Sequence, residues 1–468
     1  MKNKNSPQKL NAKQKVAVGF GAVPYSQGGQ IISTMAPSIY QIHLSMNPLL
    51  FGIAMMLPRL WGAFVDPIIG VFSDRLQTRW GRRKPLIFVG LVFMALTFNL
   101  VWWVPSDATQ LVLFLWLLIG NILFFTAYSL FAVPMTSLTY ELTPDYDERI
   151  RLMFFWALFV NLGSLSVHWF GPMTNHSIFG GNPLLGARWL ALIAGLFLFI
   201  GLGMVPLFLV KERAKSILGS GHSEGFNFSS LKKQIGSNKA LMSCLGVILP
   251  INVMGVFMGV IAQYIVIHYM FLGDLGEGMK LNAMNGTLFG IIGFITLPII
   301  LKIALRIGKE KMLKTLLLIA SFGGLIKWFT FNSEMPYLIF FDAILCGPLW
   351  AGLAVLLPAM IADVCDQDEW ISCERREGLI GSVFGIIPEI AMALSYLLTG
   401  LVLMLSGIDR EVHSADSSQG GSILILRVSF VSMAFILPLI SIYFLNKYPL
   451  SKKKVEQLRM DLEARRGA

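Results

Sequence analysis

The sequence predicts an all-α membrane protein in which twelve helices cross the bilayer as two bundles of six. Three observations indicate this fold class. First, 55% of the 468 residues are hydrophobic, only 14% are charged and the mean hydropathy is +0.66, whereas a soluble domain could not cover so much apolar surface. Second, apolar runs long enough to cross about 30 Å of hydrocarbon recur along the chain. Third, the longest polar connection divides these runs into six and six.

Several of the apolar runs are longer than the roughly 20 residues that a membrane helix needs. Prolines within them predict bends, because each proline removes one backbone hydrogen bond. The twelve expected spans are residues 16–43, 48–73, 86–105, 109–140, 150–173, 188–210, 241–270, 281–305, 311–331, 335–362, 376–407 and 422–446.

The polar connection, rich in glycine, serine and lysine, predicts the domain organisation. We expect a first six-helix bundle at 1–210, a cytoplasmic linker at 211–240, a second bundle at 241–447 and a tail at 448–468. Basic turns follow the second span of each half, as expected of two repeated bundles. The tail is basic and amphipathic, which predicts that it lies on the anionic membrane surface.

The basic residues predict the orientation in the membrane. If the N-terminus is inside, 32 of the 38 lysines and arginines lie in cytoplasmic loops or termini and only 4 lie in outer loops. Such an excess marks the cytoplasmic side of membrane proteins. We therefore expect both termini to face the cytoplasm, and we expect the membrane to be the inner, or plasma, membrane of a bacterium. The net charge of +11 then reflects topology and not nucleic-acid binding.

Other motifs exclude several classes of protein. The sequence has no P-loop, so ATP is not expected to drive it. No nucleophile and base occur at a catalytic spacing, so we do not expect an enzyme. The four cysteines, Cys244, Cys346, Cys365 and Cys373, lack metal-ligand spacing. We expect no metal, no cofactor and a monomer.

The stretch from residue 59 to residue 84 contains the most informative charges. Arg59 and Asp66 lie within the second expected span, and an ionisable residue inside the bilayer is a functional candidate because it is costly to place there. A separation of seven residues puts both on one helix face, about 10 Å apart along the axis. A strongly basic loop follows.

These motifs resemble those of a known family. The pattern Gly70-x-x-x-Asp74-Arg75 is similar to the signature loop of the major facilitator superfamily. The longer pattern resembles the glycoside–pentoside–hexuronide:cation symporters, the group of the melibiose permease, and it reads Arg59-x-Trp61-x-x-x-x-Asp66-Pro67-x-x-Gly70, then Arg79-Trp80-Gly81-Arg82-x-Lys84-Pro85. Loops at 142–149 and 362–382 agree. The resemblance covers most of the chain and implies a major facilitator fold that moves a small polar solute, a sugar or glycoside, by alternating access.

The resemblance also implies a gating role for the charged loop. In this superfamily, loops of this kind hold the two halves together in the outward-open state. Ordinary positive-inside topology explains the same charges, and we expect both explanations to apply. The expected gating residues are Asp74, Arg75, Arg82 and Arg83.

Departures from the family pattern bear on the coupling ion. The family's cation site uses two acidic residues four apart in the second span, but only Asp66 matches, because Gly62 stands at the first position. Other charged positions of the family align with Ser26 and Gln27, with Ala132 and, in place of a lysine, with Glu389. A proton needs a single carboxyl group, and apolar surroundings favour its protonated form. We therefore expect Asp66 and Glu389 to couple transport to protons rather than to sodium, if any ion is coupled.

Polar and aromatic residues within the spans are candidates for lining a solute site. Aromatic platforms and amide hydrogen bonds are typical of sugar sites, although a single residue of this kind more often belongs to an interfacial belt or a helix–helix contact. The candidates, with Arg59 as a partner for an anionic group, are Tyr25, Gln27, Gln30, Tyr128, Trp156, Asn161, Asn252, Gln263, Tyr264, His268 and Trp350.

Two further possibilities stay open. Some relatives of this family carry lysophospholipids, for which Arg59 would bind the headgroup, and a membrane enzyme or sensor is a third class.

Lys327 and Asp342 lie on consecutive spans, where we expect an interhelical ion pair.

Overall fold

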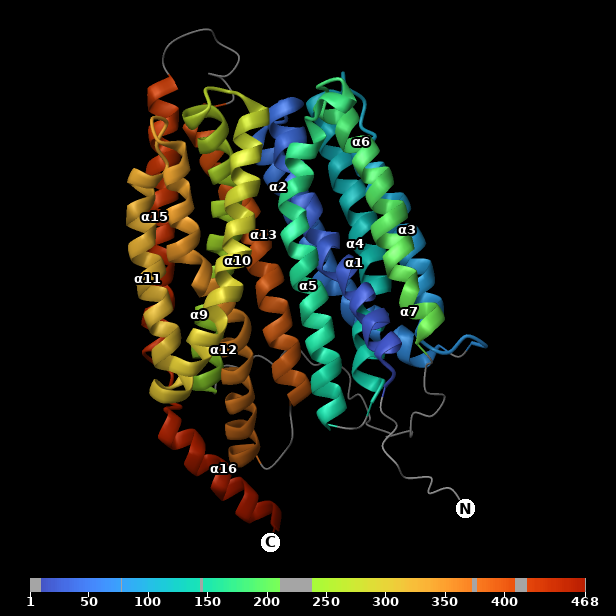
Figure 1. Ribbon diagram of the computed structural model, residues 1–468, viewed down its shortest axis with the longest axis vertical. Coiled ribbons are helices and arrows are strands. Elements are labelled where there is room, and N and C mark those ends of the chain that lie inside the picture. The colour runs from blue at the N-terminus through green and yellow to red at the C-terminus, as the bar shows by residue number, and fades with distance from the viewer. Residues whose placement is uncertain are drawn as a thin grey trace. The chain divides into compact units, whose positions relative to one another are not determined.

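The structure is a computed structural model that describes residues 10–76, 78–143, 146–210, 238–372, 377–408 and 419–467. Within these ranges the chain forms helices, short connections and one isolated β-bridge between Thr78 and Gly81. It divides into two compact units, Met1–Gly219 and Ser220–Ala468 (Figure 1). Most of the expected linker at 211–240 lies outside the described residues. The predicted all-α fold is confirmed.

Side-chain caps define where several helices of the first unit begin. Asn47 accepts hydrogen bonds from the amides of Leu49 and Leu50 at the start of α2, and Asn182 does the same at the start of α6. Such caps satisfy amides that have no partner within the helix. The helices are α1 (Ala12–Ala36), α2 (Pro48–Arg75), α3 (Lys84–Trp102), α4 (Gln110–Glu141), α5 (Tyr146–Thr174), α6 (Pro183–Ala194) and α7 (Gly203–Leu209).

The second unit begins in the same way, with Asn238 capping its first helix and Asp274 its second. After the last membrane helix, α16 packs against α12, and its residues Val455 and Leu462 are both buried. The helices are α9 (Lys239–Tyr264), α10 (Leu275–Ile307), α11 (Lys309–Thr330), α12 (Phe340–Ser372), α13 (Glu377–Ser406), α15 (Gln419–Leu445) and α16 (Lys452–Gly467).

The helices pair in the same order within each unit. In the first unit, α1 packs on α5 and α7, while α4 packs on α2 and α3. In the second unit, α9 packs on α13 and α15, while α12 packs on α10 and α11. Each unit is therefore a six-helix bundle of the same internal arrangement, as repeated transporter halves have.

Eleven helices among the described residues are long and apolar enough to cross a membrane. The remaining helix of the bundles, α1, continues without a break into the π-helical segment Pro37–His43. It is not among the eleven, and its middle turns contain Tyr25, Gln27 and Gln30. The one bundle helix that does not meet this criterion of length and hydropathy thus contributes several of the solute-site candidates.

A matching backbone feature ends the first helix of each unit. The π-helical segments Pro37–His43 and Ile265–Met270 follow α1 and α9, and each is followed by a residue with positive φ, Ser45 at 52° and Leu272 at 51°. This conformation costs a residue other than glycine about 1–2 kcal/mol. The backbone hydrogen bonds at the two ends also correspond. In the first unit, the Leu44 amide donates to the Ile39 carbonyl (2.8 Å) and the Met46 amide to the Tyr40 carbonyl (2.8 Å). In the second unit, the Phe271 amide donates to the Val266 carbonyl (3.1 Å) and the Gly273 amide to the Ile267 carbonyl (2.8 Å).

An arginine caps the end of the third helix in each unit. Arg188 of α6 donates to the carbonyls of Trp102 (3.3 Å) and Val104 (2.7 Å) at the end of α3. Arg427 of α15 donates to the carbonyl of Trp328 (2.7 Å) near the end of α11. Terminal carbonyls have no partner within a helix, and the helix dipole favours a cation there. Both arginines therefore stabilise helix ends.

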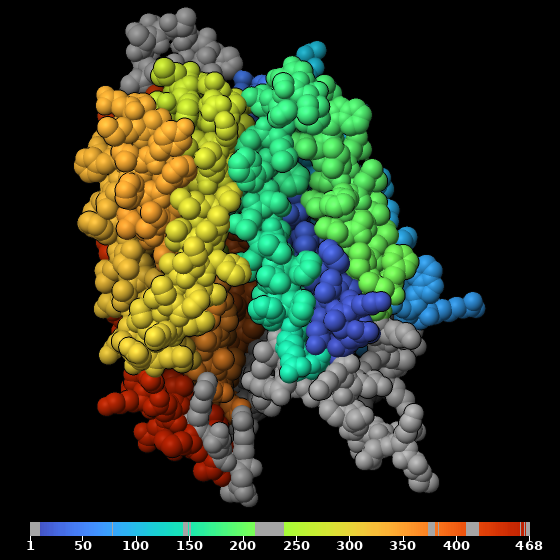
Figure 2. Space-filling model, viewed as in Figure 1, coloured from blue at the N-terminus to red at the C-terminus, as the bar shows by residue number. Residues whose placement is uncertain are grey.

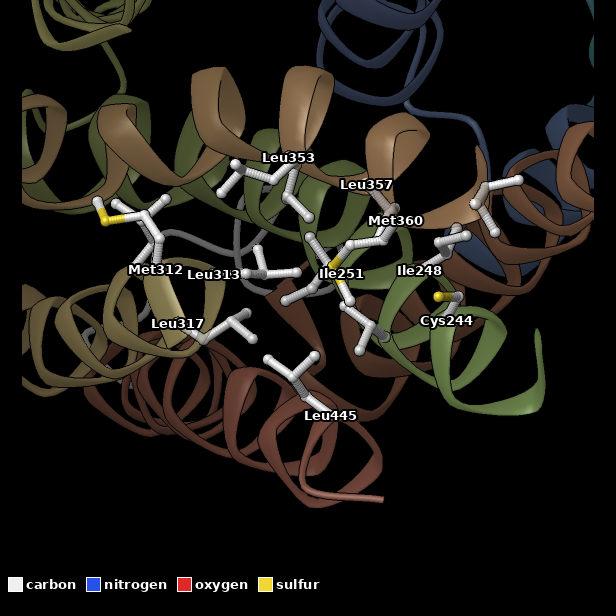
Figure 3. Packing of buried hydrophobic residues seen from close by; sticks show 14 of the residues in the cluster. Cys244, Ile248, Ile251, Met312, Leu313, Leu317, Leu353, Leu357, Met360 and Leu445 are labelled. Carbon is white, nitrogen blue, oxygen red and sulfur yellow. The ribbon is translucent and has the colours of Figure 1, made fainter. Parts of the chain in front are cut away.

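Close packing holds the helices of the second unit together (Figure 3). Side chains from α9, α11, α12 and α15, among them Ile251, Leu313 and Leu353, meet in one cluster. Hydrocarbon tails are as apolar as leucine, so such contacts act through packing. Gly324 shows how tight the packing is, because a Cβ atom there would lie 2.6 Å from the backbone of Ala434.

Candidate functional site

Three of the predicted lining residues form an aromatic cluster in the first unit. The ring of Tyr25 on α1 lies 5.2 Å from that of Trp156 on α5 and 6.2 Å from that of Tyr128 on α4, centroid to centroid. The Tyr128 hydroxyl donates to the backbone carbonyl of Tyr25 at 2.8 Å. All three side chains are half-buried. The cluster offers ring faces with partial access, which is what an aromatic platform requires.

Arg59 lies beside this cluster and is held by α1. Its Nη2 donates to the carbonyl of Gly29 at 3.2 Å and to the Ser33 hydroxyl at 3.1 Å. Its guanidinium lies 4.5 Å from the centroid of the Phe125 ring, and Phe125 contacts Tyr128 edge to face. The cation is therefore compensated by a carbonyl dipole, a hydroxyl and a π-system, which lowers the cost of its burial.

The other predicted residues of α1 and α5 have different surroundings. Gln27 is buried and its Nε2 donates to the Gly163 carbonyl (2.9 Å) and to the Ser166 hydroxyl (2.6 Å) of α5. Gln30 is exposed, and Asn161 donates to the carbonyl of Ala157 in its own helix at 2.7 Å. The described contacts of Gln27 are those of a helix–helix contact, and a solute-binding role for these three residues stays a prediction.

The surroundings of Asp66 and Gly62 bear on the ion site. Asp66 is half-buried in α2. A Cβ atom built at Gly62 would meet no atom within 4 Å among the described residues. The glycine is therefore not required by close packing, and its position has room for a longer side chain.

The candidates of the second unit are spread over several helices. The rings of Tyr264 and His268 lie 5.7 Å apart, whereas Asn252 donates to a carbonyl of its own helix. The Trp350 ring packs closely on α9, since a Cβ atom at Gly255 would lie 2.6 Å from it. Gln263 and Glu389 are half-buried. The structure thus brings Tyr264 and His268 together, and their roles in solute binding stay predictions.

The predicted ion pair between Lys327 and Asp342 is confirmed. It joins α11 to α12, and both side chains are 6% exposed. The Lys327 ammonium also lies 5.2 Å from the centroid of Phe430 and 5.6 Å from that of Phe331. The pair is therefore enclosed by aromatic rings within the second unit.

The charged loop between α2 and α3 forms hydrogen bonds with a carboxylate, Glu141, that was not predicted from the sequence. Arg83 forms two hydrogen bonds with Glu141 at the end of α4, at 2.6 and 3.1 Å, and one with Asp74 at 3.1 Å. Arg82 adds a longer contact to Glu141 at 3.4 Å. Arg75 is exposed. All these contacts lie within the first unit, and the gating role stays a prediction.

An ion pair also joins the third and fourth helices of the second unit. Lys309, the first residue of α11, pairs with the buried carboxylate of Asp363 on α12, and it donates to the carbonyl of Ala359 at 3.0 Å. In both units a basic residue at the start of the third helix therefore pairs with a carboxylate toward the end of the fourth. The pairing was not visible in the sequence, where Lys309 stood out only as part of a basic turn.

The N-terminal ends of α1 and α5 are joined by Glu148, which lies just before the membrane-spanning part of α5. Its Oε1 accepts from the Lys15 ammonium at 2.5 Å and from the Leu10 amide at 3.1 Å, and Arg151 lies 3.6 Å from Oε2. The hydrogen bond from Lys15 holds the pKa of Glu148 below its ordinary value, against an opposing effect of burial.

A lowered pKa predicts how this contact depends on pH. Ionised Glu148 stabilises the fold above its ordinary pKa of 4.5, and this contribution is lost as the pH falls through the lower pKa of the folded state. We expect the thermal stability of the purified protein to fall less between pH 6 and pH 3 in Glu148→Gln than in the unaltered protein. Equal falls would contradict the assignment, and exposed Glu277→Gln serves as the control.

Among the described residues, no group of three or more histidine, cysteine or acidic side chains lies together. The chemistry available is that of ring faces, single carboxylates and buried cations, which suits reversible binding of a solute and of a small ion.

Comparison with a solved structure supports the fold. The chain resembles the inward-facing, occupied crystal structure of a bacterial homolog of the human lysosomal transporter Spinster, with a TM-score of 0.69 and 13% identity over 94% of this chain and 97% of that one. The fold is thus that of the major facilitator transporters. The chain belongs to the MFS/sugar transport protein family, whose model matches residues 17–452.

A symporter and a sugar transporter of bacteria are among its relatives. The chain is 26% identical to the uncharacterized symporter YnaJ of Bacillus subtilis, over 98% of this chain and 96% of the relative. It is 25% identical to the isoprimeverose transporter of Lactiplantibacillus pentosus, over 83% of this chain and 79% of the relative. The protein is therefore an integral membrane secondary transporter of a small-molecule solute, and not an enzyme.

Proposed function

We propose that the solute is a sugar or glycoside that contacts the aromatic cluster of Tyr25, Tyr128 and Trp156. The observation that supports this proposal is the convergence of three half-buried rings from three helices. The C–H faces of a sugar ring pack on such rings, while its hydroxyl groups need polar neighbours. The name of the isoprimeverose transporter agrees with a carbohydrate.

Arg59 supplies the polar neighbour in this proposal. Its guanidinium is fixed against α1 by Gly29 and Ser33, so little further side-chain entropy is lost when a solute binds. A guanidinium donates through a planar fork that matches a carboxylate or a pair of hydroxyl groups. A sugar acid or a glycoside with adjacent hydroxyl groups fits this donor.

Uptake into proteoliposomes tests the solute class. We expect labelled glycosides to be taken up and labelled lysophosphatidylcholine not to be. Trp156→Ala should weaken glycoside binding by about tenfold or more, because a stacked ring contributes on the order of 1.5 kcal/mol or more. Trp189→Ala, which removes an exposed indole from α6, is the matched control.

Two results would contradict the proposal. Preferential uptake of the lysophospholipid would favour the second function considered for this family. Equal losses of glycoside binding in Trp156→Ala and Trp189→Ala would show that the aromatic cluster has no specific part in binding.

We propose further that both termini face the cytoplasm of a bacterial plasma membrane. The support is the distribution of basic residues, 32 of 38 of which then lie inside. A cysteine introduced by Ser223→Cys should resist a membrane-impermeant thiol reagent in intact cells and react after the cells are opened. Position 223 lies outside the described residues. Ready labelling of intact cells would reverse the assignment.

A further inference from the structure

The connection between α2 and α3 contains a hydrogen-bonded turn at residues 78–81. The Thr78 hydroxyl donates to the Gly81 carbonyl at 2.7 Å and accepts from the Trp80 amide at 3.2 Å, while the Gly81 amide donates to the Thr78 carbonyl at 3.1 Å. Gly81 has a φ of 107°, which favours glycine. The turn is thus fixed by its first and last residues, and its two central side chains, Arg79 and Trp80, are not needed to form it.

Both central side chains point outward. Arg79 is exposed and Trp80 is 67% exposed, which is unusual for an indole. The Trp80 ring packs edge to face on that of Phe88, at 6.3 Å between centroids. Neither Arg79 nor the nearby exposed Arg75 forms an ion pair with a residue that the structure describes. Figures 1 and 2 show this blue connection projecting sideways from α3 and α7.

The exposed face of α3 locates the turn relative to the bilayer. Val89, Phe93, Leu96, Leu100 and Trp103 are all exposed, and their spacing of three or four residues puts them on one helix face. An apolar stripe of this kind faces lipid. Phe88 and Trp80 extend it at the end where α3 begins, and Trp103 closes it at the other end, as tryptophans do at the two surfaces of a membrane.

We propose that residues 79 and 80 form an interfacial binding site for an anionic phospholipid. The Arg79 guanidinium binds the phosphate diester, and Arg75 adds positive charge. The Trp80 indole lies at the level of the glycerol backbone, against Phe88. The contact of Trp80 with Phe88 supports lipid over a soluble phosphate, because it places the turn beside the apolar face of α3 where acyl chains lie. A guanidinium suits this ligand because its planar fork matches two phosphate oxygens.

Lipid binding to the full-length protein in detergent tests this site. Native mass spectrometry would measure the apparent dissociation constants of phosphatidylglycerol and of phosphatidylcholine. We expect Arg79→Gln to weaken phosphatidylglycerol binding about fivefold, since a basic residue near an anionic surface contributes about 1 kcal/mol. Arg79→Lys should retain most of the affinity. Phosphatidylcholine binding should change little in either variant, whereas Trp80→Ala should weaken the binding of both lipids.

Controls separate this site from general surface charge. Arg306→Gln removes an exposed arginine of α10 and should leave phosphatidylglycerol binding close to that of the unaltered protein. Inorganic phosphate at the same concentration should not displace the lipid. The proposal is overturned if Arg79→Gln has no effect, if it weakens both lipids equally, or if phosphate alone competes. All variants should keep the unaltered unfolding temperature in lipid-free detergent, because Thr78 and Gly81 fix the turn.

Discussion

A proton gradient, and not a sodium gradient, is expected to drive solute accumulation in proteoliposomes containing this protein. Some of its relatives are named symporters, which implies a coupling ion. Sodium needs several oxygen ligands at one point, whereas a proton needs one carboxyl group. Asp66 stands without a second carboxylate at position 62, and Arg59 on the same helix opposes a metal cation. We propose that Asp66 and Glu389 are the groups that take up and release the proton.

Single substitutions separate coupling from solute movement. Asp66→Asn and Glu389→Gln should each abolish accumulation driven by a pH gradient while leaving measurable exchange of solute down its own gradient. Asp107→Asn, at an exposed aspartate, should leave accumulation close to that of the unaltered protein. Robust uptake driven by sodium alone would refute the proposal and would show that other oxygen atoms replace the missing carboxylate.

The open space at Gly62 allows the complementary experiment. Because a Cβ atom there meets no described atom within 4 Å, Gly62→Asp should fold and restore the two carboxylates four residues apart that the resemblance implies. We expect this variant to gain stimulation of uptake by sodium, and Gly62→Asn to gain none. Equal responses in the two variants would show that charge at this position does not select the ion.

Much of the fold follows from hydrophobicity and charge alone. Bilayer thickness sets the least length of a membrane helix, so the apolar runs indicate where most of the spans lie. The polar connection after the sixth span separates the two units, and the basic turn at Lys309 indicates the repeat. The sequence also predicted the ion pair of Lys327 and Asp342, because two opposite charges on consecutive membrane helices have few other ways to be compensated.

Contacts that depend on backbone atoms could not be predicted in this way. The partners of Arg59 are the Gly29 carbonyl and a ring, which no pattern of charges shows. Arg188 and Arg427 appeared as isolated outer charges, yet both cap helix ends. The sequence does not indicate that Glu141 pairs with Arg83, because the two residues are 58 positions apart. Such contacts depend on where and at what angle neighbouring helices cross, which the hydrophobicity of the sequence does not specify.

Removing one partner of the Lys327–Asp342 pair is expected to destabilise the protein strongly. Both side chains are 6% exposed, so Asp342→Asn would leave a buried ammonium with no compensating carboxylate. Loss of one partner of a buried pair costs about 3–5 kcal/mol. We therefore expect a clear fall in the unfolding temperature of the purified protein. Glu277→Gln, which breaks the exposed pair with Lys280, should cost about 1 kcal/mol or less.

A double substitution distinguishes compensation of charge from a specific need for the pair. Lys327→Met with Asp342→Leu removes both charges and keeps apolar volume beside Phe331 and Phe430, the rings that enclose the ammonium. Apolar replacements of buried ion pairs are often neutral or stabilising, so the double variant should recover most of the stability lost in Asp342→Asn. If it is as unstable as the single variant, the pair contributes more than mutual compensation. If Asp342→Asn alone costs about as little as Glu277→Gln, Lys327 has another partner or loses its charge.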